Sequence, residues 1–216
     1  MKSVRTQEAK IRNAQKDSQV VPRSMQPILV PPDRFPFSQP GWFYEVKWDG
    51  YRALCYYPEL KFISRNQNEL NFPELKFKLK TKAARSAVLD GEITAIDEDG
   101  RPCFDQLRRR RRTCAVVYYA FDLLFLNGED VRSLPLTERK FLLRRIIADN
   151  SRVRFVDHTF DGTALFCECE RLGLEGVVAK RANSVYTEGR SRDWLKIKTA
   201  AGRETMRLRS EAWDKR

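Results

Sequence analysis

Short strand-like stretches dominate this chain and constrain its fold more than any other feature. They are rich in aromatic and β-branched residues and end at turn residues. They lie at residues 43–48, 53–57, 61–64, 87–96, 115–126, 153–156, 176–180 and 194–198. Helical patterns interrupt them without a regular strand-helix alternation. The sequence therefore predicts an α+β domain in which strands pair mostly with their sequence neighbours, in antiparallel sheets.

Helical periodicity is clearest in LTERKFLLRRIIADN, residues 136–150. Its apolar stripe comprises Phe141, Leu142, Leu143, Ile146 and Ile147, behind a candidate N-cap at Thr137. Shorter helices are predicted at 73–82, about 104–112 and 163–172. Residues 1–24 are polar and basic without apolar periodicity and are expected to form a disordered arm. The domain is expected to span residues 25–200, followed by a basic tail at 201–216.

Several predicted strands alternate charged residues with apolar ones. In WFYEVKWDGYRALCYY, residues 42–57, one face carries Glu45, Lys47 and Asp49, and the other carries Tyr44, Val46 and Trp48. The same spacing joins Asp90 to Glu92 and Lys196 to Lys198. A single strand of this kind is also typical of a solvated sheet edge. Several together predict a charged cleft that binds an anionic ligand and a cation.

Composition limits the classes of partner. Lys and Arg number 41 against 29 Asp and Glu, and the net charge of +12 suits a polyanion such as nucleic acid, or a solubilising surface. The five cysteines form no CxxC pair and His158 is the only histidine, so we expect reduced thiols and no zinc site. No apolar run has the length of a signal peptide core or a membrane span, which favours a cytoplasmic protein. No P-loop or GxGxxG motif is present, so any nucleotide site must be built from side chains on sheets.

Six motifs in sequence order resemble those of the ATP-dependent DNA ligases, above all the ligase module of bacterial non-homologous end-joining ligases. They are EVKWDGYR, SRNQNE, LDGEI, YYAFDLLFLNG, EGVVAKR and WLKIK. The resemblance covers about residues 25–200. It implies a nucleotidyltransferase fold in which two antiparallel sheets flank a nucleotide cleft, with helices outside. It also implies ATP, bound as a covalent AMP adduct, and Mg²⁺ or Mn²⁺ as cofactors.

The resemblance assigns roles position by position. Lys47 matches the lysine that becomes adenylated and Glu45 the residue beside adenine. Arg52 and Arg65 match arginines that hold the ribose and the phosphates or the nick. Phe121 matches the aromatic residue that stacks on adenine, although a core position is equally typical of a phenylalanine in a strand.

The remaining positions imply phosphate and metal binding. Glu92 matches a carboxylate near the ribose and the metal, and Glu175 a metal-binding carboxylate. Lys196 and Lys198 match the pair that binds the α-phosphate. Trp194 is expected to pack rather than to contact the ligand.

Three departures from the family pattern are visible. Gln67 stands where the family usually has glycine. The run Arg108, Arg109, Arg110, Arg111 and Arg112 is unusually dense, and both DNA phosphate binding and a solvated basic face remain open for it. In the family, motif VI of an OB-fold domain orients the leaving pyrophosphate. We expect no such domain in these residues, so self-adenylation should be reduced.

The expected partner is nicked or broken duplex DNA, bound by a monomer away from any membrane. An OB-fold or another end-joining protein could act in trans. Three alternatives stay open: a catalytic fragment completed by such a partner, a non-catalytic module that binds adenylate and DNA ends, and, more distantly, an RNA ligase or capping-type nucleotidyltransferase.

Overall fold

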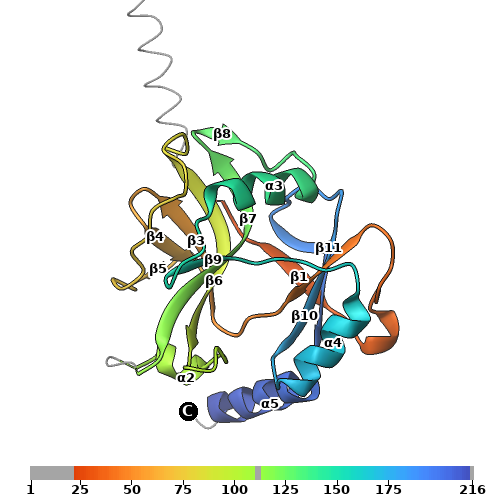
Figure 1. Cartoon of the computed structure of the whole chain (residues 1–216). Helices are drawn as coiled ribbons and strands as arrows, with labels where there is room; N and C mark the ends of the chain where they lie inside the picture. Colours follow the sequence, from red (N-terminus) through yellow and green to blue (C-terminus); the bar gives the residue numbers. More distant parts are fainter. Residues whose placement is uncertain (1–21, 110–112, 215–216) are drawn as a thin grey trace, which may run out of the picture.

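Two β-sheets lie side by side, with helices on their outer surfaces (Figure 1). The computed structural model describes residues 22–109 and 113–214, with side chains as far as Glu211. The smaller sheet has the order β1 (Met25–Leu29), β11 (Gly189–Lys198), β10 (Gly176–Arg181) and β2 (Trp42–Val46). The larger sheet has the order β5 (Glu69–Leu70), β4 (Lys61–Ser64), β3 (Tyr51–Tyr57), β6 (Ala87–Ile96), β7 (Ala115–Leu126) and β8 (Glu129–Asp130), and β9 (Val153–Phe155) pairs with β7.

Most neighbouring strands are antiparallel. Two pairs, β1 with β11 and β7 with β9, are parallel. The predicted α+β class with two sheets is confirmed, although both sheets are mixed rather than wholly antiparallel. The strands predicted from residue 43 onward are all present, whereas β1, β5 and β8 were not predicted.

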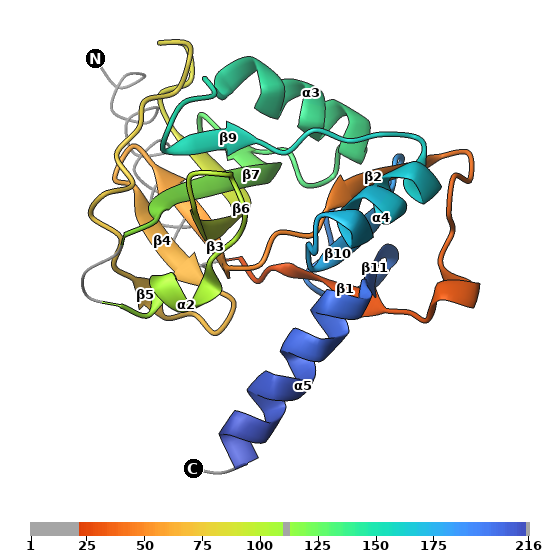
Figure 2. The ribbon, with the colours of Figure 1, turned by 60° about the horizontal axis from the view of Figure 1, so that its bottom comes forward.

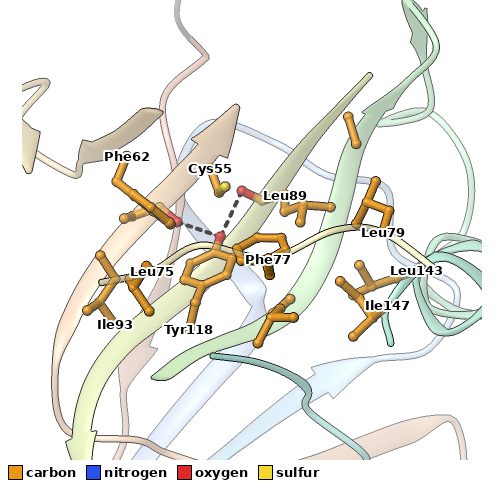
Figure 3. Close-up of a cluster of buried hydrophobic side chains, with 14 of the residues drawn as sticks. Cys55, Phe62, Leu75, Phe77, Leu79, Leu89, Ile93, Tyr118, Leu143 and Ile147 are labelled. Carbon is orange, nitrogen blue, oxygen red and sulfur yellow. Dashed lines mark hydrogen bonds between the residues drawn. The ribbon is translucent and has the colours of Figure 1, made fainter. Parts of the chain in front are cut away.

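The core of the larger sheet is organised around Tyr118, which is fully buried on β7 (Figure 3). Its ring packs against Phe62 and Phe77, and the single proton of its hydroxyl is shared between the backbone carbonyls of Ala53 and Leu89, each 3.0 Å from the hydroxyl oxygen. A buried hydroxyl without partners would destabilise the fold, so these two bonds allow tyrosine at the centre of an apolar cluster.

The helix predicted at 73–82 is wrong. These residues form an extended segment with turns, in which Leu75, Phe77 and Leu79 are buried while Lys76 and Lys78 are exposed. Apolar residues at every second position give a period of two, which is the period of an extended chain rather than of a helix.

The other predicted helices are present with changed bounds. α2 (Phe104–Leu107) is shorter than predicted, and α4 (Gly162–Arg171) is shifted by one residue. Most of the predicted tail forms α5 (Ala200–Asp214), which begins one residue before it. α4 is capped by Asp161, whose carboxylate accepts from the backbone N–H of Ala164. Residues 1–21 of the predicted arm lie outside the described residues.

α3 (Leu136–Ile146) begins after Pro135, so Thr137 lies inside its first turn and is not the N-cap. The predicted apolar stripe is partly wrong, because Phe141 is 61% exposed. The buried face instead includes two cations, Arg139 and Lys140, between Leu136 and Leu143. α3 therefore presents charge to the interior of the protein.

α3 and α5 lie on opposite sides of the two sheets (Figure 2). α3 packs on β7, α4 packs on β10 and β2, and α5 runs outward from the end of β11. The five cysteines are free thiols, as predicted. In the described part of the chain, no helix combines the length and apolarity that crossing a membrane requires.

Candidate active site

A pocket of about 350 Å³ opens between the two sheets, and the motifs predicted to bind nucleotide converge on it. Of the predicted site residues, the pocket is lined by Glu45, Lys47, Arg52, Arg65, Glu92, Phe121 and Lys196. They come from β2, β3, β6, β7 and β11 and from the turns that follow β2 and β4. Glu175 joins this group through its contact with Lys47, and Lys198 joins it through its contact with Glu175.

Lys47 lies at the mouth of the pocket, just after the end of β2. Its backbone N–H donates to Gly176 O at 2.9 Å, and its Nζ donates to Glu175 Oε2 at 2.5 Å. The second oxygen of Glu175 lies 2.9 Å from Nζ of Lys198. Burial opposes the ionised form of Glu175, but Lys47 and Lys198 outweigh it and hold the pKa of Glu175 below its usual value.

Gly176 allows Glu175 to reach Lys47. A Cβ at Gly176 would lie 2.0 Å from the carbonyl oxygen of Ile197, and its φ of +153° is one that residues with side chains rarely adopt. Only glycine fits there without a shift in the backbone. Glu175 therefore enters the cleft from just before β10, while Val178 and Lys180 face the same pocket from the strand itself.

The predicted alternation along residues 44–49 is correct only up to Val46, where β2 ends. Trp48, predicted to lie on the strand face opposite Lys47, lines the same pocket and stacks on Tyr119 with ring centroids 3.9 Å apart. Asp49 accepts two hydrogen bonds from Arg209 of α5, at 3.0 and 2.6 Å. The turn after β2 thus directs both Lys47 and Trp48 into the cleft.

Lysines concentrate positive charge beside Glu175. Burial lowers the pKa of Lys196, and the ammonium groups of Lys47 and Lys198 lower it further. Such a group of lysines is suited to binding phosphate, because each ammonium is a point charge with free donors.

Glu92 is a carboxylate in the pocket whose pKa is strongly raised. Burial raises its pKa to about 8, Lys47 and Arg52 oppose the increase, and Glu175 and Asp49 add to it. At neutral pH, a pKa raised in this way favours the protonated carboxyl. Adding a cation there would favour the ionised form, which is the behaviour expected of a carboxylate that binds a metal.

Arg52 is held against the wall of the pocket by Asp90. Its guanidinium donates to both carboxylate oxygens, at 3.1 and 2.6 Å, and Asp90 also accepts from the hydroxyl of Tyr186 at 2.7 Å. Burial disfavours the charge, but Asp90 raises the pKa of Arg52 above its usual value. The guanidinium lies over the rings of Phe121 and Trp194, with its central carbon 5.2 and 5.4 Å from their centroids.

The inner end of the pocket holds a buried group of three charges. The carboxylate of Glu45 lies 2.6 Å from Nζ of Lys140 and 2.5 Å from Nζ of Lys180, and the three side chains are at most 3% exposed. Burial raises the pKa of Glu45, but the two lysines more than offset it, and the net pKa is lowered. Burial lowers the pKa of Lys180 to about 8 against the opposing effect of Glu45.

Sequence reasoning missed Lys140 and Tyr186 and gave Lys180 no role; it placed Asp90 on a charged strand face with Glu92 but did not predict its contact with Arg52. A signal existed for Lys180, since it shares a strand face with Val178. Trp194 is 1% exposed and packs against Phe121 and Tyr186, as expected, and it also forms part of the pocket wall. No sequence pattern marks Lys140 as a partner of Glu45, from which it is separated by 95 residues.

The two remaining predicted features lie at or beyond the rim. Arg65 is exposed at the edge of the pocket that it helps to line. In the turn after it, Gln67 adopts a φ of +62° at the position where the family usually has glycine. Arg108 and Arg109 are exposed and do not line the pocket. Arg110, Arg111 and Arg112 lie outside the described residues.

Comparison with known proteins gives consistent matches. The family model for the ATP dependent DNA ligase domain matches residues 33–198. The multifunctional non-homologous end joining protein LigD of Pseudomonas aeruginosa is 35% identical over 167 residues, which are 73% of this chain and 20% of that protein. The SPbeta prophage-derived DNA ligase-like protein LigB of Bacillus subtilis is 32% identical over 183 residues, 80% of this chain and 67% of that protein.

A solved structure of mycobacterial DNA ligase D complexed with ATP and MES has a TM-score of 0.65 and 27% identity, covering 82% of this chain and 60% of that one. The chain spans about a fifth of the length of the Pseudomonas relative and 67% of the Bacillus relative.

Proposed function

This chain belongs to the family of ATP-dependent DNA ligase domains, and from that membership we propose that it adenylates its own Lys47 with ATP and passes the AMP to a 5′-phosphate at a break in duplex DNA. The observation that carries the proposal is the contact of Lys47 with Glu175, beside Lys196 and Lys198, at the mouth of a pocket lined by Phe121. The ATP complex of the mycobacterial relative supports the choice of nucleotide.

In the first step, Nζ of Lys47 forms a bond to the α-phosphorus as the bond to the bridging oxygen breaks and pyrophosphate leaves. Nζ reacts as the free amine, so a proton passes to solvent. Lys196 and Lys198 bind the α-phosphate and stabilise the negative charge that develops there. Glu175 holds Nζ in place before the nucleotide binds, and positioning of this kind supplies a large part of such rate accelerations.

In the later steps, an oxygen of the DNA 5′-phosphate attacks the α-phosphorus and the bond to Lys47 breaks. The 3′-hydroxyl then attacks the 5′-phosphorus and AMP leaves. Arg65, exposed at the rim, is placed to contact DNA phosphates, and the run Arg108–Arg112 is proposed to add affinity that falls as salt rises.

Glu92 and Glu175 are the proposed ligands of Mg²⁺ or Mn²⁺. No three or more His, Cys, Asp or Glu side chains gather in metal-binding arrangement within residues 22–109 and 113–211. Proteins usually bind Mg²⁺ through one or two carboxylates, and substrate phosphates complete its coordination. Glu92 with its raised pKa fits such a site. The bound metal would neutralise charge on the phosphates.

We propose that the domain acts as a monomer and that its partner is duplex DNA. The relatives are longer than the chain, and we include in the proposal an OB-fold that cooperates with it in cis or in trans.

A gel assay with a 5′-labelled nicked duplex, ATP and Mg²⁺ tests the proposal. The wild-type chain is expected to produce adenylated DNA and sealed product. Lys47→Arg keeps the positive charge for Glu175 but removes the nucleophile, so both products should disappear. Lys76→Arg, at an exposed lysine outside the pocket, is the matched control and should retain activity. Product formation by Lys47→Arg at the wild-type rate would disprove the assignment.

A further inference from the structure

Lys140 lies behind the pocket and not in its lining. Its Nζ donates to Glu45 Oε1 at 2.6 Å and to the carbonyl of Val156 at 2.8 Å, and it lies 4.7 Å from the ring centroid of Phe155. The side chain is 3% exposed. Two of the three N–H donors of the ammonium are thus bonded within the protein and the ring of Phe155 covers it, so Lys140 acts on Glu45 and not directly on a ligand.

Glu45 and Lys180, in contrast, both line the pocket. Nζ of Lys180 lies 4.2 Å from the ring centroids of Phe121 and Trp194 and 2.5 Å from Glu45 Oε2. An ionised carboxylate has about four acceptor positions. The hydrogen bond from Lys140 takes one of them, whereas Lys180 forms an ion pair with Oε2 without hydrogen-bond geometry. Glu45 therefore keeps acceptor capacity on a wall that the ligand reaches.

The helix that carries Lys140 is itself fixed. The preceding residue, Arg139, donates to both oxygens of Asp122 at 2.8 and 2.9 Å and to the carbonyls of Ser184 and Leu134. Both charged side chains of this pair are fully buried. α3 is thus bound to β7 of the larger sheet through Arg139 and to β2 of the smaller sheet through Lys140.

Building on the proposed function, we propose that Lys140 is a positioning residue for recognition of adenine. It fixes the carboxylate of Glu45 so that a free lone pair accepts from the 6-amino group of the base. A purine with a 6-keto group presents an acceptor at that position, which the carboxylate repels. Without Lys140, Lys180 is the one cation within the described residues that still contacts Glu45, and it draws the carboxylate out of this orientation.

The test compares binding of two nucleotides that differ only at position 6: ATP and purine riboside triphosphate, which lacks the amino group. Dissociation constants are measured by calorimetry in EDTA, and adduct formation is measured separately by mass spectrometry with Mg²⁺. The wild-type protein should prefer ATP by roughly tenfold or more, the value of a hydrogen bond to a charged group. Lys140→Met should reduce this preference to less than about threefold.

Arg145→Met is the matched control, since it removes a cation from the exposed side of the same helix and should leave the preference unchanged. In a Glu45→Gln background, Lys140→Met should have no further effect on the preference, because Lys140 acts through Glu45. If Lys140→Met does not fold, Lys140→Gln, which keeps an N–H donor but loses the charge, takes its place.

Equal weakening of both nucleotides by Lys140→Met would leave the preference intact and show that Lys140 is only structural. Absence of any preference in the wild-type protein would also overturn the proposal. If Lys140→Met reduces the preference for ATP as expected but the wild-type protein forms no AMP adduct with Mg²⁺, the proposed ligase function is wrong and the role of Lys140 is not.

Discussion

Replacing Arg139 by Met is expected to destabilise the protein strongly, because it leaves the carboxylate of Asp122 buried without a counter-charge. Both side chains are 0% exposed and are joined by two hydrogen bonds. The substitution also removes the donor to the carbonyls of Leu134 and Ser184. Methionine fills a similar volume, so the effect reports mainly on charge and hydrogen bonding.

Breaking a buried ion pair by removing one partner typically costs about 3–5 kcal/mol. For a domain of this size, each kcal/mol lowers Tm by roughly 2–4 °C, so Arg139→Met should melt roughly 6–20 °C below the wild-type protein. Arg144→Met, on the exposed face of the same helix, loses a surface ion pair with Asp149 and a contact with the ring of Phe155 and should cost about 0–1 kcal/mol.

Urea unfolding followed by circular dichroism measures both variants. The double variant Asp122→Leu with Arg139→Met removes both charges and should be more stable than Arg139→Met alone. Equal unfolding free energies for Arg139→Met and Arg144→Met would refute the reasoning, since the two differ mainly in burial of the charge.

Three further predictions concern the site. Gly202→Ala places a Cβ 2.0 Å from the carbonyl oxygen of Glu175 and should therefore displace Glu175. Formation of the AMP adduct in single-turnover assays should then be roughly ten- to a hundredfold slower, and an unchanged rate would show that Glu175 does not position Lys47. Burial lowers the pKa of Lys180 from 10.5 to about 8, so charged Lys180 costs stability below pH 8 and this cost is relieved between pH 8 and 10.5. Relative to Lys180→Met, the wild-type protein should therefore gain up to about 3 kcal/mol of unfolding free energy between pH 7 and pH 10.5, and a constant difference would contradict the shift. The 216-residue chain alone should join a pre-adenylated nick faster than an ordinary nick, by roughly a hundred- to a thousandfold, since only the second requires pyrophosphate to leave; equal rates would contradict this.

The sequence predicted the strands well because each carries a period of two over several residues. The same period was overlooked at 73–82, where leucine, lysine and glutamate favour a helix by composition but alternate as in an extended chain. Tertiary structure decided this segment, which buries Leu75, Phe77 and Leu79 against the larger sheet.

The motifs likewise predicted which residues line the pocket but not what holds them. Lys140 belongs by residue type to the polar side of α3, and the prediction placed Phe141 inside instead. A buried lysine is tolerated only with a partner, and that partner, Glu45, becomes a neighbour only when the two sheets meet. Such pairings between distant segments are not visible in the local pattern of a single sequence.

The intact mass of the protein after incubation with ATP and Mg²⁺ tests the central claim most directly. The account predicts an increase equal to one AMP, located on the peptide that contains Lys47, and no corresponding GMP adduct with GTP. Lys47→Arg, which keeps a positive charge next to Glu175, should show no increase in mass. An AMP adduct on another residue, or an adduct that persists in Lys47→Arg, would contradict the account.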